Sequence, residues 1–309
     1  MSEKDDRVGV VIRDEGNVVH VDFPGETESV PCVIRKSLRR RAGKRSKPVV
    51  VGDRVVVEFS GEGAAVASVQ PRTSRLSRPD PLRRHREHII VANIDSVLVV
   101  DSVREPDLTP GLIDRFLVAV ESRDLTAAIA INKFDLGASP EQIAVIDVYR
   151  ELGYPVFEVS ADEGRGIEEV REFLRDKTTS LLGHSGVGKS SIANALDPAL
   201  QLRVGEVSEG SGKGQHTTTT VSLLPLHWGG YLVDTPGIRE FGLWSMEPRE
   251  LGHWFRDLES FLHDCRFNDC LHRNEPDCAV KAAVERGDLA AWRYESYLRI
   301  LDSLADEVS

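Results

Sequence analysis

The segment GHSGVGKS, at residues 183–190, constrains the fold of this 309-residue chain more than any other feature. It matches the pattern G-x-x-x-x-G-K-[ST] and lies between an apolar run that ends at Leu182 and a helix-like run that begins at Lys189. The glycines let backbone N–H groups surround a phosphate, and the N-terminus of the following helix adds a favourable dipole. The pattern predicts a strand, a phosphate-binding loop (P-loop) and a helix within an α/β domain.

Apolar strand-like and helix-like segments alternate from residue 89 onward, which is typical of a mainly parallel sheet covered by helices. We expect strands at 96–101, 126–132, 155–160 and 178–183, and helices near 110–122, 140–152, 166–175 and 189–196. Residues 221–228 and 231–234 are expected to form a hairpin around Gly229 and Gly230. After about residue 245 the pattern is helical again.

Residues 7–69 contain five short β-like segments separated by Gly and charged turns. We expect a small closed barrel of the OB type, which typically binds single-stranded nucleic acid. Residues 74–88, rich in Arg and Pro, are interpreted as a basic linker. A loop between the third and fourth segments carries eight basic side chains: Arg35, Lys36, Arg39, Arg40, Arg41, Lys44, Arg45 and Lys47.

The net charge of -11 is divided unevenly along the chain. Residues 1–90 hold 18 Lys and Arg against 13 Asp and Glu, whereas residues 91–309 hold 21 against 37. A basic face on an acidic body favours a polyanion contact at one end, although a solvated basic loop would look the same in sequence. No stretch approaches the roughly 20 apolar residues of a membrane-spanning helix, and no signal peptide is evident, so we expect a cytoplasmic protein.

Chemistry at the P-loop depends on its last residues. Lys189 is expected to reach the outer phosphates of a nucleotide, and the Ser190 hydroxyl is expected to coordinate Mg2+. The residues expected to contact the nucleotide here are Gly183, His184, Ser185, Gly186, Val187, Gly188, Lys189, Ser190 and Ser191.

The tetrapeptide NKFD, at residues 132–135, indicates which base is bound. The Asp135 carboxylate can accept two hydrogen bonds from guanine, and adenine offers no equivalent pair. Asn132 is expected to tie this loop to its neighbours, and Lys133 and Phe134 complete the segment. Taken alone the tetrapeptide is also compatible with an ordinary strand-end turn, but Ser160 and Ala161 follow at the end of another expected strand, where a small residue admits a backbone N–H to the guanine carbonyl.

DTPG, at residues 234–237, ends the last expected strand of this domain. Asp234 fits an acid on the Mg2+ shell, and the Gly237 N–H fits a sensor of the γ-phosphate. A threonine of residues 217–220, for which we choose Thr218, is expected to complete the Mg2+ shell, although a simple polar loop would also contain such residues. Ile238 stands where many GTPases have a water-orienting glutamine, so His216 is our candidate for that work, the alternative being a contact with RNA or solvent.

The order of these motifs is NKFD, Ser160–Ala161, P-loop, threonine loop and DTPG, whereas ordinary GTPases begin with the P-loop. This order is a circular permutation. It can preserve the site because all of these loops leave the carboxyl ends of strands in one sheet.

The last cluster has the spacing C-x4-C-x-H-x5-C and consists of Cys265, Cys270, His272 and Cys278. Three thiolates and an imidazole form a closed tetrahedral set, which predicts one structural Zn2+ per chain without a catalytic role. A disulfide is the less attractive alternative in a reducing compartment. Cys32, alone in a strand, is interpreted as a core residue.

The whole chain resembles the ribosome small subunit-dependent GTPase A family, also called RsgA or YjeQ. The resemblance covers VGDRV in the barrel, then NKFD, GHSGVGKSS, GQHTTTT and DTPGI, and finally the Cys/His cluster with AVKAAVERG and RYESYL. It implies a GTPase of late small-subunit maturation, stimulated by that subunit, whose OB barrel and zinc domain contact rRNA.

We therefore expect a multidomain chain: an OB barrel at 1–73, a basic linker at 74–88, a circularly permuted GTPase domain at 89–245 and a mainly helical zinc module at 246–309. The expected ligands are GTP or GDP with Mg2+, the expected partner is the small subunit with its rRNA, and the expected state is a monomer. Two alternatives stay open at this point: a GTPase that acts on another RNA or protein, and a nucleic-acid-binding module whose nucleotide site is regulatory or inactive.

Overall fold

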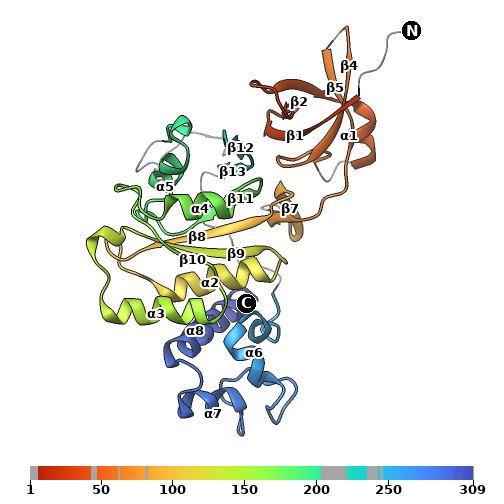
Figure 1. The fold of residues 1–309 in the computed structure, drawn as a ribbon. Coiled ribbons are helices and arrows are strands. Elements are labelled where there is room, and N and C mark those ends of the chain that lie inside the picture. The colour runs from red at the N-terminus through yellow and green to blue at the C-terminus, as the bar shows by residue number, and fades with distance from the viewer. Residues whose placement is uncertain are drawn as a thin grey trace, which may run out of the picture. The chain divides into compact units, whose positions relative to one another are not determined.

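The computed structural model describes residues 6–42, 47–61, 63–80, 83–202, 221–234, 243 and 246–308, with side chains omitted at 41, 42, 78–80, 83–88 and 306–308. Contacts divide the chain into two compact units. The first comprises residues 1–97, 171–181 and 197–240, and the second comprises residues 98–170, 182–196 and 241–309. Figure 1 traces the chain from the N-terminal strands in red to the C-terminal helices in blue.

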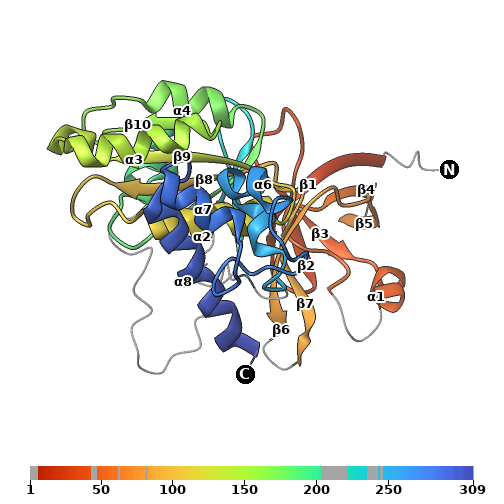
Figure 2. The same ribbon diagram turned by 90° about the horizontal axis from the view of Figure 1, so that it is seen from below.

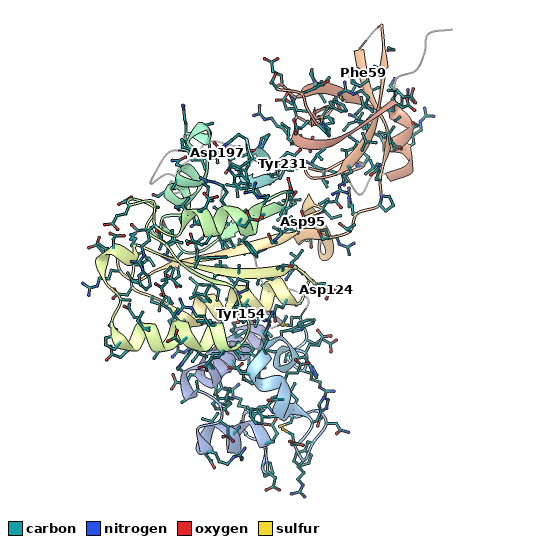
Figure 3. The ribbon with its side chains drawn as sticks, viewed as in Figure 1. Phe59, Asp95, Asp124, Tyr154, Asp197 and Tyr231 are labelled. Carbon is teal, nitrogen blue, oxygen red and sulfur yellow. The ribbon has the colours of Figure 1, made fainter. Side chains whose placement is uncertain are left out.

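The first unit begins with a five-stranded barrel of strands β1 (Asp6–Asp14), β2 (Val18–Asp22), β3 (Val30–Ile34), β4 (Arg54–Ser60) and β5 (Gly63–Val69). β1 pairs antiparallel with β2 and β4, β2 with β3, and β4 with β5, and the parallel β3–β5 pair closes the ring. Inward-facing side chains such as Val21, Phe23 and Cys32 fill the interior, and the Phe23 ring lies 5.7 Å from that of Phe59, which is labelled in Figure 3. The expected barrel and the core position of Cys32 are confirmed.

The basic segment after β3 is not a loop throughout, because its first part forms helix α1 (Lys36–Ala42). Leu38 packs against the barrel core and gives the helix an apolar anchor. Some of the basic charge is paired within the barrel, since Arg35 forms an ion pair with Glu58, and Lys47 Nζ lies 2.6 Å from Asp14 Oδ2.

The segment interpreted as a basic linker instead forms an antiparallel pair, β6 (Arg75–Asp80) and β7 (Arg83–Ala92). Leu76 pairs with Val91 in register, and both side chains are buried. These apolar residues flank the Arg- and Pro-rich part and supply the burial that the composition of 74–88 does not indicate.

The first unit also contains β11 (Thr178–Leu182), β12 (Ser222–Pro225) and β13 (Tyr231–Asp234). β13 pairs parallel with β11 and antiparallel with β12, which confirms the hairpin around Gly229 and Gly230. Both glycines have positive φ, and a Cβ on Gly230 would meet the Lys177 backbone oxygen at 2.5 Å. The hydroxyl of Tyr231, labelled in Figure 3, donates to Asp22 of β2 at 2.6 Å.

A short turn, η3 (Pro198–Leu200), precedes this hairpin in the chain. Asp197, also labelled in Figure 3, accepts hydrogen bonds from Ala199 and from the backbone and ring of His227, so it joins the turn to the hairpin loop.

The second unit carries the other α/β elements. Strands β10 (Val156–Glu158), β9 (Thr126–Asn132) and β8 (Ser96–Ser102) are neighbours in that order, and β10 runs parallel to β9. Every residue of β8 is buried, as expected for a strand covered on both faces. The helices of this region are α2 (Pro110–Glu121), α3 (Pro140–Glu151), α4 (Ile167–Leu174) and α5 (Lys189–Leu196), with the short turn η2 (Phe134–Leu136) after β9.

The C-terminal part of this unit is helical, as expected, with η4 (Leu251–Trp254), α6 (Arg256–Leu262), α7 (Ala279–Arg286) and α8 (Ala291–Val308). Val280 of α7, Phe255 before α6 and Tyr297 of α8 are among its buried side chains. α8 packs against α2 of the α/β part (Figure 1, Figure 2).

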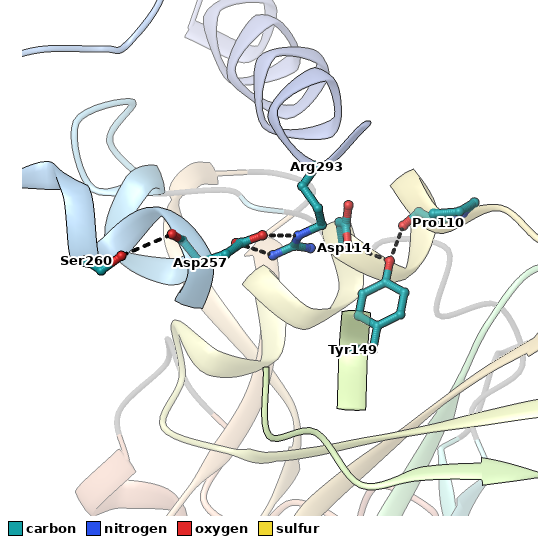
Figure 4. Close-up of polar contacts among 6 residues, drawn as sticks. All are labelled: Pro110, Asp114, Tyr149, Asp257, Ser260 and Arg293. Carbon is teal, nitrogen blue, oxygen red and sulfur yellow. Dashed lines mark hydrogen bonds and ion pairs between the residues drawn. The ribbon is translucent and has the colours of Figure 1, made fainter. Parts of the chain in front are cut away.

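A buried polar cluster joins α6 and α8 to α2 and α3 of the α/β part (Figure 4). Arg293 of α8 donates from Nε and Nη2 to the two oxygens of Asp257 in α6, both at 2.7 Å, and its Nη1 pairs with Asp114 of α2. The Tyr149 hydroxyl of α3 lies 2.7 Å from the same Asp114 carboxylate. The Arg293 and Asp114 side chains are 2% and 0% exposed, so each charge depends on its partners for compensation.

Among the described residues, no helix is both long enough and apolar enough to span a membrane.

Candidate guanine-nucleotide site and zinc centre

The P-loop follows β11 and runs into the first turn of α5. Gly183, Gly186 and Gly188 all have positive φ, at 155°, 87° and 93°. Lys189 Nζ donates to the backbone oxygens of Gly183 at 2.8 Å and His184 at 2.7 Å, and burial lowers its pKa. The loop therefore curls around its own lysine, and two of the three ammonium N–H donors point to loop carbonyls, which leaves one donor for a phosphate held by the backbone N–H groups.

Asn132, at the end of β9, connects three segments. Its side-chain nitrogen donates to the Val187 oxygen of the P-loop at 2.9 Å, and its side-chain oxygen accepts from the Ala161 N–H at 3.2 Å. Gly188 lies against the Asn132 amide so closely that a Cβ there would collide with it. The structure thus brings together NKFD, Ser160–Ala161 and the P-loop.

The rest of NKFD projects from the end of β9. Lys133 has φ of 58° and its Nζ donates to the backbone oxygen of Glu105. The Phe134 N–H donates to the Val159 oxygen at 3.0 Å, and the Arg165 guanidinium lies 5.4 Å from the Phe134 ring centre. Asp135 is exposed, so its carboxylate is accessible to a ligand.

Ser160 is buried and its hydroxyl accepts from the Glu163 N–H at 3.2 Å, so it stabilises the turn after β10. The Ala161 N–H, which was expected to face a guanine carbonyl, is engaged with Asn132 in this structure. A guanine carbonyl would share or replace that bond.

The residues expected at the γ-phosphate and Mg2+ are Asp234, Gly237, Thr218 and His216. Asp234 closes β13 in the first unit, and burial raises its pKa. Gly237, Ile238, Thr218 and His216 lie outside the described residues.

Asp101, at the end of β8, was not among the expected site residues. Its side chain is buried, and burial raises its pKa to about 6, while backbone hydrogen bonds from Ser102 and Thr109 and the charge of His184 act in the opposite direction. An acid that directly follows a buried strand, as Asp101 follows SVLVV, was the available signal.

The Cys/His cluster lies between α6 and α7. The ligand atoms of Cys265, Cys270, His272 and Cys278 all lie within 4.8 Å of one another. His272 Nδ1 is 3.4 Å from Cys265 Sγ and 3.5 Å from Cys278 Sγ, and the two sulfurs are 3.9 Å apart. Ligands around a tetrahedral zinc ion would be separated by about 3.8 Å for two sulfurs and about 3.5 Å for sulfur and nitrogen. The cluster is therefore consistent with zinc.

Surrounding contacts orient the cluster. Tyr294 and Tyr297 of α8 donate to the backbone oxygens of His272 at 2.6 Å and Leu271 at 2.9 Å. Burial lowers the pKa of His272, which favours the neutral imidazole that binds metal, and burial raises the pKa of Cys270 to about 12. Metal binding would have to displace the thiol protons, as such sites require.

A P-loop tied to a guanine-type NKFD segment that precedes it in the chain defines a circularly permuted GTPase. Residues 69–244 match the family RsgA GTPase. The chain belongs to this RsgA GTPase family, as its resemblance in sequence implied, and it is an enzyme that hydrolyses GTP.

Relatives from two organisms match almost the whole chain. "Small ribosomal subunit biogenesis GTPase RsgA" of Gemmatimonas aurantiaca is 42% identical, over 96% of this chain and 97% of the relative. The protein of the same name from Shewanella oneidensis is 43% identical, over 93% of this chain and 81% of the relative.

Two crystal structures are also similar. YjeQ from Thermotoga maritima has a TM-score of 0.78 and 35% identity, over 97% of this chain and 99% of that chain. YloQ, described as a circularly permuted GTPase, has a TM-score of 0.73 and 30% identity, over 98% of this chain and 96% of that chain.

Proposed function

We propose that this protein hydrolyses GTP in the late maturation of the small ribosomal subunit and that the subunit stimulates the hydrolysis. The observation that carries the nucleotide part is the Asn132 side chain, which bonds to Val187 of the P-loop and to Ala161. The names of the relatives support the ribosomal part.

In this proposal Asp135 accepts hydrogen bonds from guanine, and the P-loop N–H groups and Lys189 bind the phosphates. The exposure of Asp135 and the position of Lys189 among the loop carbonyls support these roles. Ser190, Asp234 and Thr218 would hold Mg2+, which neutralises charge on the phosphates when GTP is bound.

Activation of the attacking water needs a further group, because Ile238 has no hydrogen-bonding side chain. We assign this work to His216, whose ordinary pKa lies near neutral pH, with Gly237 sensing the γ-phosphate. Both residues lie outside the described part of the chain.

The barrel and the zinc module are proposed to contact rRNA. Exposed Lys36, Arg39 and Arg40 on α1 support the barrel contact, since Arg35 and Lys47 are paired with acids of the barrel itself. We propose that one Zn2+ per chain stabilises the module and that the protein acts as a monomer in the cytoplasm, where subunits mature.

The test is GTP hydrolysis by the purified protein in Mg2+ buffer, alone, with purified small subunits and with purified large subunits. We expect slow hydrolysis alone, strong stimulation by small subunits and none by large subunits. Equal rates in all three would contradict the proposed partner, although GTP hydrolysis itself would stand.

His216→Ala tests the assignment of the water-activating group in the same assay. We expect GTP and subunit binding to be retained and stimulated turnover to fall by ~100-fold. Full stimulation of this variant at saturating subunit would mean that the ribosome supplies the group.

A further inference from the structure

Residues 101–109, here called the bracket segment, comprise the last two residues of β8 and the connection to α2, and they lie beside both halves of the proposed nucleotide site. The Val103 N–H donates to the backbone oxygen of Asn132 at 3.1 Å, and the backbone oxygen of Glu105 accepts from Lys133 Nζ. On the other side, the ring of Pro106 would lie 3.4 Å from a Cβ placed on Gly186 of the P-loop. The bracket segment therefore bonds to the base-reading tetrapeptide and lies beside the phosphate loop.

One buried carboxylate joins the two ends of the bracket segment. Asp101 Oδ1 accepts from the Ser102 N–H at 2.7 Å, and Oδ2 accepts from the Thr109 N–H at 3.0 Å. The Asp101 side chain has little room to move, because the residue is only 4% exposed. Thr109 is the N-cap of α2 and its own side chain does not cap the helix, so the carboxylate also occupies a favourable place near the helix N-terminus.

The middle of the bracket segment needs this support. Glu105 has φ of 53°, a left-handed conformation that is unfavourable for a residue with a side chain. The Ser102 hydroxyl donates to the Pro106 oxygen at 2.7 Å and closes the turn around Glu105. Asp101 and Ser102 together hold the Glu105 oxygen where Lys133 meets it.

We propose that Asp101 is a positioning residue for guanine-nucleotide binding, which holds the bracket segment so that Lys133 and Gly186 keep their places around the nucleotide. This inference rests on the proposed nucleotide site. The bracket segment lies beside the base-reading tetrapeptide and the middle of the P-loop. Its support should therefore increase the affinity for GDP and for GTP equally. The proposal also predicts that Asp101 affects nucleotide affinity and does not affect the rate at which bound GTP is hydrolysed.

The test is calorimetric titration of the full chain with GDP and with a non-hydrolysable GTP analogue, at a temperature where circular dichroism shows each variant folded. In Asp101→Asn the side-chain nitrogen would face one of the two N–H donors, so we expect Kd for both nucleotides to rise about tenfold. The unstimulated kcat at saturating GTP should stay within about twofold. Asp107→Asn, an exposed acid of the same segment, is the matched control and should bind as the wild type does.

A folded Asp101→Asn variant with wild-type Kd values would overturn the inference, as would a loss confined to the GTP analogue. If that variant does not fold, Ser102→Ala carries the test, with an expected rise of about threefold in both Kd values and rejection if affinity is unchanged. Failure of the wild-type protein to bind GDP would instead reject the proposed nucleotide site.

Discussion

The side-chain nitrogen of Asn132 donates to the backbone oxygen of Val187 across 2.9 Å, which joins the end of β9 directly to the P-loop. Gly188 makes this contact possible because a Cβ at that position would collide with the same amide. The two parts of the proposed nucleotide site, NKFD and the P-loop, are therefore held together by one asparagine and one glycine that are far apart in sequence.

Asn132→Ala and Gly188→Ala should both weaken GDP and GTP binding, by about tenfold each, since each removes the same contact. The double variant should lose much less than the product of the two losses, because residues that share one interaction are not additive. Titration of all three variants with GDP gives the coupling free energy between Asn132 and Gly188. Independent losses that multiply would show that the two residues act separately.

Asp135→Asn should weaken GTP binding by at least tenfold and improve binding of xanthosine triphosphate, because the amide can donate where the carboxylate accepts. Competition titrations with both nucleotides measure the change in preference. Asp124→Asn, an exposed acid before the start of β9 (labelled in Figure 3), should keep the wild-type preference. An unchanged preference in Asp135→Asn would remove the guanine-reading role.

Arg293→Met should lower the free energy of unfolding by about 3–5 kcal/mol, because it leaves the buried Asp114 carboxylate and the partly buried Asp257 carboxylate without their cation. Urea denaturation measures the loss. Arg299→Met is the control on the same helix, since Arg299 forms an exposed ion pair with Glu295 and its loss should cost less than about 1 kcal/mol. Equal losses in the two variants would mean that the buried cluster contributes no more to the free energy of unfolding than the surface ion pair does.

Cys270→Ser should lower the zinc content well below one per chain and unfold residues after about 245, while nucleotide binding is retained. Such sites supply roughly 10–16 kcal/mol of apparent binding free energy to their modules. Metal analysis and hydrogen exchange report the two effects. Cys32→Ala removes a barrel cysteine outside the cluster, so this variant should retain one zinc ion per chain. Wild-type protein purified without chelators that holds far less than one zinc would reject the site.

Asp101 should make stability depend on pH. Its pKa in the folded protein is raised from 3.8 to about 6, so the folded state binds the proton more tightly than the unfolded state does. The stabilising contribution is therefore present below about pH 4 and is lost as the pH rises through 6, by about 3 kcal/mol at about 1.4 kcal/mol per pKa unit. Urea unfolding at pH 4.5, about 5.5 and 7 should show the wild type losing stability relative to Asp101→Asn as the pH rises. A difference that does not vary with pH would contradict the raised pKa.

Much of the fold was predictable because its signals are local. The P-loop, NKFD and the Cys/His cluster each lie within a few residues, and the apolar periods of 96–101 and 126–132 match β8 and β9. The pair β6 and β7 was not predicted, because the many Arg and Pro residues between Leu76 and Val91 are typical of a linker. The sequence does not indicate that Leu76 and Val91 pair and are buried. Helix α1 was missed for a similar reason, because among its described side chains Leu38 is the apolar one that packs on the barrel core.

The connections between motifs could not be read from the sequence. Asp101 acquires its role from Thr109, eight positions away, and from the contact of the bracket segment with Lys133. Arg293 and Asp114 are separated by 179 positions, and no local pattern indicates that they meet. Such partners depend on how helices pack, which single-sequence periodicity does not specify.

The separation of Arg293 from Asp114 also bears on how the protein is made. Translation proceeds from the N-terminus, and domains generally begin to fold in that order. A nascent chain that has completed α2 and α3 carries Asp114 and Tyr149 long before the codon for Arg293 is read. The α/β core therefore leaves the exit tunnel with an acid that has no cation, and it reaches its final stability only when α8 emerges and closes onto it.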